Sequence, residues 1–552
     1  MAQNRGMISE KESDAASSGQ GAESAGARPG TVYLVGGGPG DPGLVTVRGA
    51  ELIASADVIL HDELVHPALL EGARPGAEVR SVGKRGGDQA SKQAKQEAIS
   101  AELVVFAKKN LRVVRLKGGD PFLFGRGSEE ALALVAAGVP FEIVPGVISP
   151  LAAAAYAGIS LTHRDLASSV TLVSGTTREG APFDLRELAG LKGTVCVLMG
   201  MHDIERIAAG LIEDAGRDPA TPAAVVQWGT RAEQRVVEGR LDDIARAARA
   251  EGLGSPAIIL VGEVVSLRGG LRWFDAWPLF GKRVLITRPR DQAGGVARLV
   301  RRRGGEAVLW PAIEIGPPPD PAAAARAARG VDHFDLVVFT SENGVSRFFG
   351  ELLAAGRDAR ALGRSRVAAI GPGTAAALRE RGIFADIVPG VYRGEALAEA
   401  ILADPVIASE LRARASTGGG SPLRVLIPRA LVAREVLADR LRAAGCEVSV
   451  VPVYETRPAS PEAQAELRRR MREGGVDIVL LTSSSMADSL SEALGPEAPE
   501  LLRGVLLASI GPITTATAEK RGLSVSVTAG ESTTSGLIDA VEKHLAHLAR
   551  AR

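Results

Sequence analysis

The sequence predicts an α/β protein with mainly parallel sheets. Two short apolar strands in the first half each lead into a glycine-rich turn and then into a helical stretch. In the second half, one pattern of strands and turns occurs twice. Apolar strands that alternate with alanine-rich helical segments are typical of a parallel sheet covered by helices.

The composition limits the kinds of protein that this chain can be. The chain has 552 residues, which is too long for a single hydrophobic core. At about 150 residues per domain, this length predicts three to four domains. The 65 basic and 65 acidic residues cancel, which argues against binding nucleic acid through bulk charge. No apolar run reaches the ~18 residues of a membrane span. Because Cys196 and Cys446 are the only cysteines, we expect a protein of the reducing cytoplasm. From the balanced charge and the lack of a membrane span we expect neither nucleic-acid nor membrane partners.

Three segments are predicted to lie outside the domain cores, namely a tail, a loop and a linker. Residues 1–29 are rich in Ser, Gly, Ala and Glu, which predicts a disordered tail without the apolar segment of a signal peptide. Residues 415–422 predict an exposed loop. Residues 273–280 form a linker between the two halves, and their aromatic side chains indicate that this linker is packed.

The first glycine turn is GGGPGDPG at residues 36–43. A strand is predicted before it at 31–35, and a helix follows through about residue 56. The glycines do not fit the G-x-G-x-x-G pattern of dinucleotide-binding turns, and two prolines interrupt the turn. Alone, the turn is compatible with either a ligand site or a tight connection.

The second turn, RLKGGDPFLFGRG at residues 115–127, is the most informative segment of the chain. A strand is predicted at 111–116 and a helix begins near residue 128. Adjacent glycines and an Asp-Pro pair weaken regular structure, so folding alone does not explain the segment. Backbone amides in such a turn, flanked by basic side chains, favour an anionic ligand.

Further segments accompany the two glycine turns. They are Pro145-Gly146, AYAGISLTHRD at 155–165, Leu198-Met199-Gly200, Gly229-Thr230, Gln234-Arg235 and VGEVV at 261–265. Together they resemble the uroporphyrinogen-III C-methyltransferases of the tetrapyrrole methylase family. The resemblance covers roughly residues 30–271 and implies a two-lobed methylase domain at 30–272.

The resemblance implies that S-adenosylmethionine is the methyl donor. The residues that it places around this donor are Pro39, Gly118, Gly119, Asp120, Leu123, Ile148, Ser149, Met199 and Gly229. Asp120 would hold the ribose or the amino group. Ile148-Ser149 replaces the Thr-Ala or Thr-Ser that the family usually shows, so a backbone contact is retained there and a threonine hydroxyl contact is not.

Two residues match the family's proposed proton-transfer groups. Asp62 matches the proton acceptor and Lys84 the proton donor. A turn aspartate and a carboxylate-clamping lysine are the alternatives, because a lysine of ordinary pKa near 10.4 is a poor acid at pH 7. The candidates to hold the eight substrate carboxylates are Arg85, Arg115, Lys117, Arg126, His163 and Arg164, with a solvated basic face as the alternative. No His/Cys cluster has metal-ligand spacing, so we expect no metal.

The second half is an internal duplication. Four segment pairs repeat with offsets of 140 to 142 residues. The pairs are LITR at 285 with LIPR at 426, PAIE at 311 with PVYE at 452, FDLVVFTS at 334 with VDIVLLTS at 476, and IGPGT at 370 with IGPIT at 510. One period fits all four, which predicts two α/β units rather than a solenoid of short repeats.

Ligands of parallel sheets bind beyond the carboxyl ends of the strands. The residues predicted there are Thr340, Ser341, Gly371, Thr374, Arg429, Thr482, Ser483, Gly511 and Thr514. Two facing copies would line a cleft with hydroxyl and amide groups, which suits a large anion. Helix capping by the Ser and Thr residues is the alternative.

These duplicated motifs resemble uroporphyrinogen-III synthase over roughly residues 281–547, within a synthase domain at 281–552. The resemblance implies one lobe at 281–315 plus 457–552 and another at 318–453, joined by strands at 311–316 and 451–456. If the synthase acts mainly by folding the substrate so that it closes in the right way, no single residue need be essential for catalysis. Tyr454, on the second linker, is the candidate acid that assists departure of the substrate hydroxyl, and packing between the lobes is the alternative.

The two resemblances imply one bifunctional enzyme of tetrapyrrole biosynthesis. It would close hydroxymethylbilane to uroporphyrinogen III and methylate that product twice to precorrin-2, for sirohaem or cobalamin. We expect a homodimer formed through the methylase half. One alternative is a methylase for a later precorrin, with a non-catalytic two-lobed tetrapyrrole-binding module. The other is a periplasmic-type binding protein, against which the missing signal peptide argues.

Overall fold

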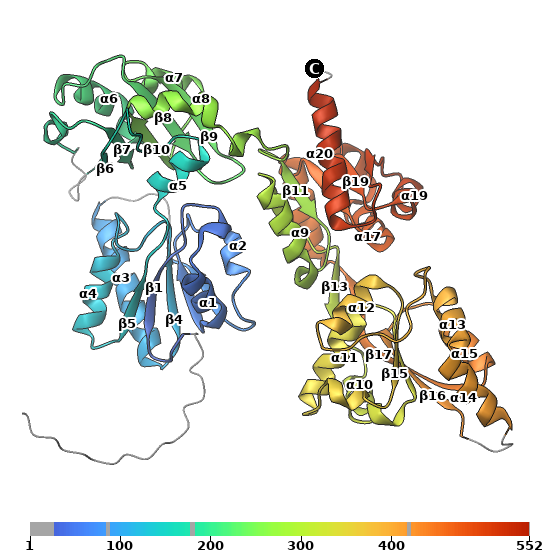
Figure 1. Ribbon diagram of the computed structural model, residues 1–552. Helices are drawn as coiled ribbons and strands as arrows, with labels where there is room; N and C mark the ends of the chain where they lie inside the picture. The colour runs from blue at the N-terminus through green and yellow to red at the C-terminus, as the bar shows by residue number, and fades with distance from the viewer. Residues whose placement is uncertain (1–26, 84–88, 177–182, 417–420, 551–552) are drawn as a thin grey trace, which may run out of the picture. The chain divides into compact units, whose positions relative to one another are not determined.

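The computed structural model describes residues 27–83, 89–176, 183–416 and 421–550 (Figure 1). The chain forms two compact units, Met1–Gly281 and Lys282–Arg552. Most of the predicted tail, together with Lys84 and Arg85, lies outside the described residues. Ala27 is already buried in the first core, and the Arg28 amide donates to the Tyr33 hydroxyl over 2.7 Å. The folded part therefore includes residues that the predicted tail contained.

The first unit begins with a five-stranded parallel sheet of order β3-β2-β4-β1-β5. The strands are β1 (Val32–Gly36), β2 (Val58–His61), β3 (Glu78–Ser81), β4 (Val113–Lys117) and β5 (Phe141–Val144). The helices are α1 (Val47–Ser55), α2 (Pro67–Leu70), α3 (Gln89–Lys108) and α4 (Gly127–Ala136). Successive strand side chains point to opposite faces. Tyr33 and Val35 therefore pack with α1 and α2, whereas Val32 and Leu34 pack with α3 and α4.

A second sheet completes the first unit, with order β6-β7-β10-β8-β9. Its strands are β6 (Val170–Ser174), β7 (Thr194–Leu198), β8 (Pro222–Gln227), β9 (Arg235–Arg240) and β10 (Ala257–Val261). The accompanying helices are α5 (Ser149–Tyr156), α6 (Ile204–Glu213), α7 (Ile244–Ala250) and α8 (Arg268–Leu271). Only β6 and β7 pair in parallel. The sheet is mixed because β10 lies antiparallel between β7 and β8.

The segment at 273–280 packs onto the first unit. Phe274 and Leu279 are buried, and the indole of Trp273 donates to the Ala155 carbonyl over 2.8 Å. Tyr156 meets the Trp273 and Phe274 rings edge-on, with centroids 5.0 and 4.8 Å apart. Trp277 extends the same cluster.

The second unit contains two sheets. The first has order β12-β11-β18-β19-β20 and is parallel throughout. Its strands are β11 (Arg283–Ile286), β12 (Glu306–Leu309), β18 (Ile478–Leu481), β19 (Leu506–Ser509) and β20 (Val527–Thr528). Its helices are α9 (Arg290–Arg302), α16 (Pro461–Arg472), α17 (Ser484–Leu494), α18 (Ala498–Leu501), α19 (Pro512–Lys520) and α20 (Thr534–Arg550). Because β11 pairs with β18, both ends of the second unit build one lobe.

The other sheet has order β13-β17-β16-β14-β15 and is parallel except for the β13–β17 pair. Its strands are β13 (Ile313–Gly316), β14 (Leu336–Phe339), β15 (Arg366–Ala369), β16 (Leu423–Ala430) and β17 (Cys446–Pro458). Its helices are α10 (Pro321–Arg329), α11 (Glu342–Ala354), α12 (Pro372–Arg379), α13 (Gly394–Ala403), α14 (Pro405–Ser416) and α15 (Val436–Ala443). The antiparallel pair of β13 and the end of β17 lies at the passage between the lobes, where the sequence predicted two linking strands.

An aspartate–arginine pair fixes neighbouring strands in both units. The Asp57 carboxylate accepts from the Arg112 amide at 2.8 Å and from its guanidinium at 2.9 Å. Asp477 holds the amide and guanidinium of Arg283 in the same way. The Arg112 side chain lowers the pKa of Asp57, because hydrogen bonds to the carboxylate favour its charged form.

None of the described helices is long and apolar enough to cross a membrane. Cys196 and Cys446 are buried and free, and burial raises the pKa of both thiols.

Candidate active sites

The two glycine turns of the first unit are bonded to each other. They meet because β1 and β4 are neighbours in the sheet. The Gly37 amide donates to the Lys117 carbonyl over 2.7 Å. Gly38 and Gly119 exchange backbone hydrogen bonds of 3.2 and 2.7 Å. Segments that are 80 residues apart in sequence thereby form one surface at the carboxyl ends of the strands.

Glycine is needed where this backbone meets the segment after β5. A Cβ on Gly36 would lie 2.5 Å from Gly146 and 2.7 Å from the Gly119 carbonyl. A Cβ on Gly146 would lie 2.2 Å from that same carbonyl. Gly119 itself has φ +66, and the nearest atom to its Cβ position is the Ser149 amide nitrogen, 3.9 Å away. Its open side faces the start of α5.

Asp120 organises the second glycine turn. Its carboxylate accepts from the Phe122 amide over 2.8 Å and from the Gly146 amide over 2.9 Å. Through these bonds, Asp120 holds the turn against the segment that precedes α5. The half-buried carboxylate lies among the residues predicted to bind the cofactor, and it retains further acceptor capacity for a ligand.

Backbone strain concentrates around the same turns. In the described parts of the chain, the non-glycine residues with positive φ are Asn110, Phe124, Arg126, Met199, Trp228 and Thr230. Phe124 and Arg126 belong to the second glycine turn, Met199 follows β7, and Trp228 and Thr230 follow β8. Such conformations persist where the surroundings enforce them, and they cluster at ligand sites.

Contacts from the second sheet complete this region. The Asp41 amide donates to the Thr230 hydroxyl over 2.9 Å, and the Tyr156 hydroxyl donates to the Asp41 carboxylate over 2.6 Å. A Cβ on Gly229 would lie 2.3 Å from the Ala153 Cβ of α5, so only glycine fits there. Burial, followed by the bond to Asp41, raises the pKa of Tyr156.

Most residues predicted to hold the cofactor thus lie on connected turns. Pro39, Gly118, Gly119 and Asp120 lie on the two bonded glycine turns, and Leu123 follows in the second turn. Ile148 occupies the N-cap of α5, and Ser149 begins that helix. Gly229 packs on α5, and Met199 follows β7, with its carbonyl 3.0 Å from the Cβ position of Gly175.

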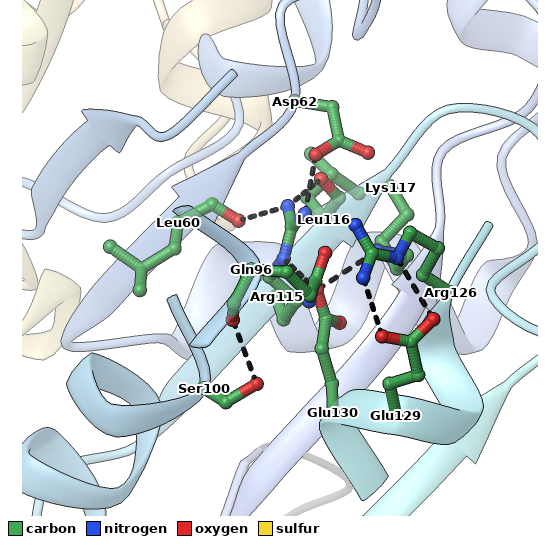
Figure 2. A network of polar contacts seen from close by, with 10 residues as sticks. All are labelled: Leu60, Asp62, Gln96, Ser100, Arg115, Leu116, Lys117, Arg126, Glu129 and Glu130. Atoms are coloured by element: carbon green, nitrogen blue, oxygen red, sulfur yellow. Dashed lines mark hydrogen bonds and ion pairs between the residues drawn. The ribbon is translucent and has the colours of Figure 1, made fainter. Parts of the chain in front are cut away.

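Three buried charged residues, Arg115, Lys117 and Glu130, lie on β4 and α4, the elements on either side of the second glycine turn (Figure 2). Arg115 and Lys117 are both 2% exposed, and Glu130 of α4 is fully buried. One oxygen of Glu130 accepts from the Arg115 Nε over 3.1 Å and from the Lys117 Nζ over 3.1 Å. The structure therefore corrects the assignment of Arg115 and Lys117 to substrate carboxylates, because internal carboxylates already neutralise both cations.

Asp62 follows β2, and its carboxylate accepts a hydrogen bond from the guanidinium of Arg115. Its side chain is 33% exposed, so it reaches solvent while a buried cation fixes its position. The Asp62 amide donates to the Leu116 carbonyl over 3.1 Å, and the Asp62 carbonyl accepts from the Val65 amide over 3.2 Å. The residue is thus a turn aspartate, and its carboxylate remains accessible for chemistry.

The other predicted carboxylate-binding residues are more exposed. Arg126 bonds the carboxylate of Glu129 at 2.6 to 2.9 Å and the amide oxygen of Gln93 at 2.7 Å. His163 accepts from the Asp165 amide over 3.2 Å, and Arg164 is exposed. Arg126, His163 and Arg164 therefore remain candidates on geometric grounds.

The second unit contains a cavity of about 360 Å³. It is lined by Arg288, Gln292, Ser341, Glu342, Asn343, Ile370, Gly371, Pro372, Gly373, Thr374 and Tyr392. Arg288 and Gln292 come from the lobe of β11, and the other residues come from the lobe of β14. The Gln292 side chain donates to the Asn343 side chain over 2.7 Å, which joins the lobes beside the cavity.

Three predicted residues line this cavity, namely Ser341, Gly371 and Thr374. Ser341 also caps α11 by accepting from the Gly344 amide over 3.0 Å. In the second copy, Ser483 caps α17, and Thr482 donates to the Met486 sulfur over 3.0 Å. Gly511 is the N-cap of α19, and Thr514 is buried in its first turn. Both serines therefore cap helices, and Ser341 also faces the cavity.

Arg429 does not line the cavity. It is 6% exposed, its guanidinium is paired with Glu435, and it donates to the Arg434 carbonyl over 3.0 Å. The structure corrects its assignment to substrate binding, because its charge is committed within its own lobe. Thr340 lies at the end of β14, next to Ser341, and is not among the cavity-lining residues.

Tyr454 packs inside the lobe of β14 and is 6% exposed. Its hydroxyl lies 3.0 Å from the Ser341 hydroxyl, which faces the cavity. Burial raises the pKa of Tyr454, and the bond to Ser341 partly offsets that effect. The ring is therefore a packing element, and only the hydroxyl reaches the cavity, through Ser341.

Eight cavity residues were absent from the predicted site, namely Arg288, Gln292, Glu342, Asn343, Ile370, Pro372, Gly373 and Tyr392. Arg288 had a signal, because it follows β11 directly and its segment is repeated at residue 426. Tyr392 lies against Gly371, and the second copy has Ser532 at the corresponding place against Gly511, so the tyrosine itself is not repeated and no pattern marked it. Among the described residues, no group of three or more His, Cys, Asp or Glu side chains could hold a metal ion.

Comparison with known proteins defines the class of both units. A family model for tetrapyrrole (corrin/porphyrin) methylases matches residues 31–245. A model for the uroporphyrinogen-III synthase HemD matches residues 295–539. Each match lies within one of the two compact units.

Two relatives of known sequence match more than half of this chain. The chain is 36% identical over 512 residues to the porphyrin biosynthesis protein HemD of Ruminiclostridium josui, across 92% of this chain and 97% of that protein. It is 38% identical to the uroporphyrinogen-III C-methyltransferase of Bacillus subtilis, across 60% and 68% of the two chains. The chain therefore belongs to the family of porphyrin biosynthesis proteins that join a tetrapyrrole methylase to a uroporphyrinogen-III synthase.

Other relatives match less than half of this chain. A siroheme synthase of Pseudomonas fluorescens is 47% identical over 248 residues, and the match spans about half of its length, 53%. The uroporphyrin-III C-methyl transferase of Thermus thermophilus, solved with S-adenyl homocysteine, is 42% identical over 43% of this chain and 99% of its own, with a TM-score of 0.38. A mutant uroporphyrinogen III synthase of the same organism is 18% identical over 48% and 99%, with a TM-score of 0.36.

Proposed function

We propose that this protein carries out two successive steps of tetrapyrrole biosynthesis. Its second unit would close hydroxymethylbilane to uroporphyrinogen III, and its first unit would methylate that product twice to give precorrin-2. The observation that carries the proposal is the presence, in one chain, of a tetrapyrrole methylase at 31–245 and a uroporphyrinogen-III synthase at 295–539. The product of one predicted reaction is the substrate of the other.

The glycine turns fit S-adenosylmethionine as the methyl donor. Gly36, Gly119 and Gly146 bring three backbone segments to a separation that excludes side chains, and the open side of Gly119 faces the Ser149 amide. Such a surface offers amide groups and close approach to a ligand. Pro39, Gly118 and Asp120 would also hold the donor. When bound, S-adenosylmethionine supplies an electrophilic methyl group.

Asp62 is the group best placed to accept the proton that methylated carbon must release. Arg115 holds one carboxylate oxygen, and the side chain keeps one-third of its surface exposed. Positioning of the acceptor is the main contribution of the protein, because a well-placed general base contributes ~10²–10⁴-fold.

The cavity of the second unit suits a flexible polyanion. Arg288 supplies a guanidinium, and the N-cap residues of α11 and α12, Ser341 and Gly371, also line the cavity. Cations and helix N-termini both favour carboxylates. Closure of the bilane would depend on holding its two ends together, which is an entropic contribution.

One incubation tests both activities in the full-length protein. Hydroxymethylbilane alone should give uroporphyrinogen III, and addition of S-adenosylmethionine should convert it to precorrin-2, both read by chromatography after oxidation. Uroporphyrinogen III supplied directly tests the methylase separately. Formation of only the type I isomer would exclude the synthase, and unmethylated uroporphyrinogen III in the presence of the donor would exclude the methylase.

A further inference from the structure

Glu130 is a buried carboxylate on which three donors converge (Figure 2). Its Oε1 accepts from the Nε of Arg115 and the Nζ of Lys117, each over 3.1 Å, and from the Nε2 of Gln96 over 3.0 Å. The donors come from β4 and α3, and Glu130 itself lies in the first turn of α4. One oxygen atom thus ties two helices to the strand that leads into the second glycine turn.

Stability alone does not explain this carboxylate. Its second oxygen, Oε2, is buried and has no hydrogen-bond partner within the described structure. A buried polar atom without a partner costs about 1–3 kcal/mol, and buried ion pairs are often no more stabilising than apolar residues of the same size. An arrangement that carries this cost at the edge of a proposed active site calls for a functional explanation.

Arg115 links Glu130 to the active site. Its Nε donates to Glu130, and another guanidinium nitrogen donates to Asp62. The remaining nitrogen donates to the carbonyls of Leu60 and Leu116, over 3.4 and 3.2 Å. Since a guanidinium is planar and rigid, fixing its Nε edge also fixes the edge that faces Asp62.

The charged groups around Glu130 fall into two sets. Arg115 and Lys117 of β4 share the carboxylates of Glu130 and Asp62, the residue that follows β2. Arg126, which precedes α4, is paired with Glu129, and His61 at the end of β2 bonds the Asp62 carbonyl. Burial, and next the charge of Arg115, lowers the pKa of Lys117. For Arg115, burial opposes the charged form, but Asp62 and Glu130 overcome it and raise its pKa. Loss of the Glu130 charge would leave Asp62 as the remaining carboxylate partner of Arg115.

We propose that Glu130 is a positioning residue for methyl transfer, because it fixes the Arg115 guanidinium that orients Asp62. The inference rests on the proposed role of Asp62 as proton acceptor. Glu130 does not touch the substrate. By binding the Nε of Arg115, Glu130 determines which edge of the guanidinium faces Asp62. It also keeps that Nε from forming a second hydrogen bond to the Asp62 carboxylate.

The first test is Glu130→Gln in the full-length protein, with uroporphyrinogen III and S-adenosylmethionine as substrates. We expect kcat to fall about 10- to 100-fold, by analogy with residues that orient a metal ligand through a hydrogen bond. The dissociation constant of S-adenosylmethionine should stay unchanged. The matched control is Glu142→Gln, which removes an exposed carboxylate that is paired with Arg48 over 3.0 Å.

A double-mutant cycle separates this inference from the proposed function. In an Asp62→Asn background, Glu130→Gln should have little further effect on kcat, because its effect acts through Asp62. Multiplicative losses would overturn the positioning role while leaving the role of Asp62 intact. An Asp62→Asn variant as active as the unsubstituted protein would instead overturn the proposed role of Asp62, and this inference with it.

Glu130→Asp provides the same test if the glutamine variant does not fold. It keeps the buried negative charge that Arg115 and Lys117 require but shortens the side chain by one methylene. The bond to the Arg115 Nε should lengthen, and kcat should fall while the dissociation constant of S-adenosylmethionine stays unchanged. A folded Glu130→Asp variant with an unchanged kcat would overturn the inference.

Discussion

Gly38 and Gly119 hold each other through two backbone hydrogen bonds, of 3.2 and 2.7 Å. This pair joins the turn after β1 to the turn after β4. Gly119 has φ +66, and its open side faces the start of α5 across 3.9 Å. The relationship makes Gly119 the position at which the proposed cofactor surface is most sensitive to an added atom.

We predict that Gly119→Ala weakens S-adenosylmethionine binding by at least about tenfold, or 1.4 kcal/mol. The added methyl group occupies the open side of the turn. Gly138→Ala is the matched control, because Gly138 also has φ +66 but has no atom within 4 Å of its Cβ position. Both variants bear the left-handed strain of about 1–2 kcal/mol, so calorimetric titration isolates the effect of position. Equal affinity in both variants would remove Gly119 from the cofactor site.

We predict that Asp62→Asn lowers methylation turnover about 10²- to 10⁴-fold without changing S-adenosylmethionine affinity. The amide keeps the shape of the side chain but cannot accept a proton. Steady-state kinetics with uroporphyrinogen III, combined with titration of the donor, provide the measurement. A loss in turnover of less than about tenfold, below the range of a general base, would leave Asp62 as a turn residue.

We predict that Tyr454→Phe slows closure of hydroxymethylbilane and increases the share of the type I isomer. The change removes the hydroxyl 3.0 Å from Ser341 and leaves the buried ring in place. The unfolding free energy should fall by about 1 kcal/mol, as for one lost hydrogen bond. Chromatography of the isomers decides the outcome. An unchanged rate and isomer ratio would show that Tyr454 only packs, and Arg288 would then be the next cavity residue to substitute.

We predict that the Asp57–Arg112 pair makes the first unit sensitive to acid. Because Arg112 lowers the folded-state pKa of Asp57, the stabilisation is complete above the unfolded pKa of about 3.9 and is lost as the pH falls toward the folded value. Asp57→Asn should cost roughly 2 kcal/mol at pH 7 and remove this acid dependence. Hydrogen exchange of β2 and β4 amides at pH 3 and 7 measures both effects. Asp184→Asn, at an exposed pair with Arg186, should change neither.

The sequence contained the fold because its patterns are local and repeated. Strand, turn and helix at residues 31–56 follow from apolar periodicity, and the 140-residue offset predicts paired lobes. Arg115 and Lys117 were misassigned because basic residues beside a glycine turn are typical of anion sites. Both lie in a central parallel strand, where charges must be paired. That rule indicates a buried partner, but only the packing of α4 identifies Glu130.

The synthase site was predicted less completely for a related reason. The duplication marks residues that occur in both copies, such as Ser341 and Ser483. Gln292, Asn343 and Tyr392 have no such repeat signal, although they line the cavity. Rotamers and loop paths decide their positions, and neither is encoded in a short motif. The burial of Tyr454 likewise depends on how β17 turns against α11.

The pairing of β11 with β18 has a consequence for biosynthesis on the ribosome. Arg283 and Asp477, which clamp these strands, are separated by 194 residues of chain. The lobe that contains β11 therefore cannot close until translation has passed β18, whereas β14, β15 and β16 pair as soon as they have emerged. The newly made β11 must wait with its edge unpaired while the middle lobe folds. Ribosome stalling between the two segments would leave that edge open to aggregation.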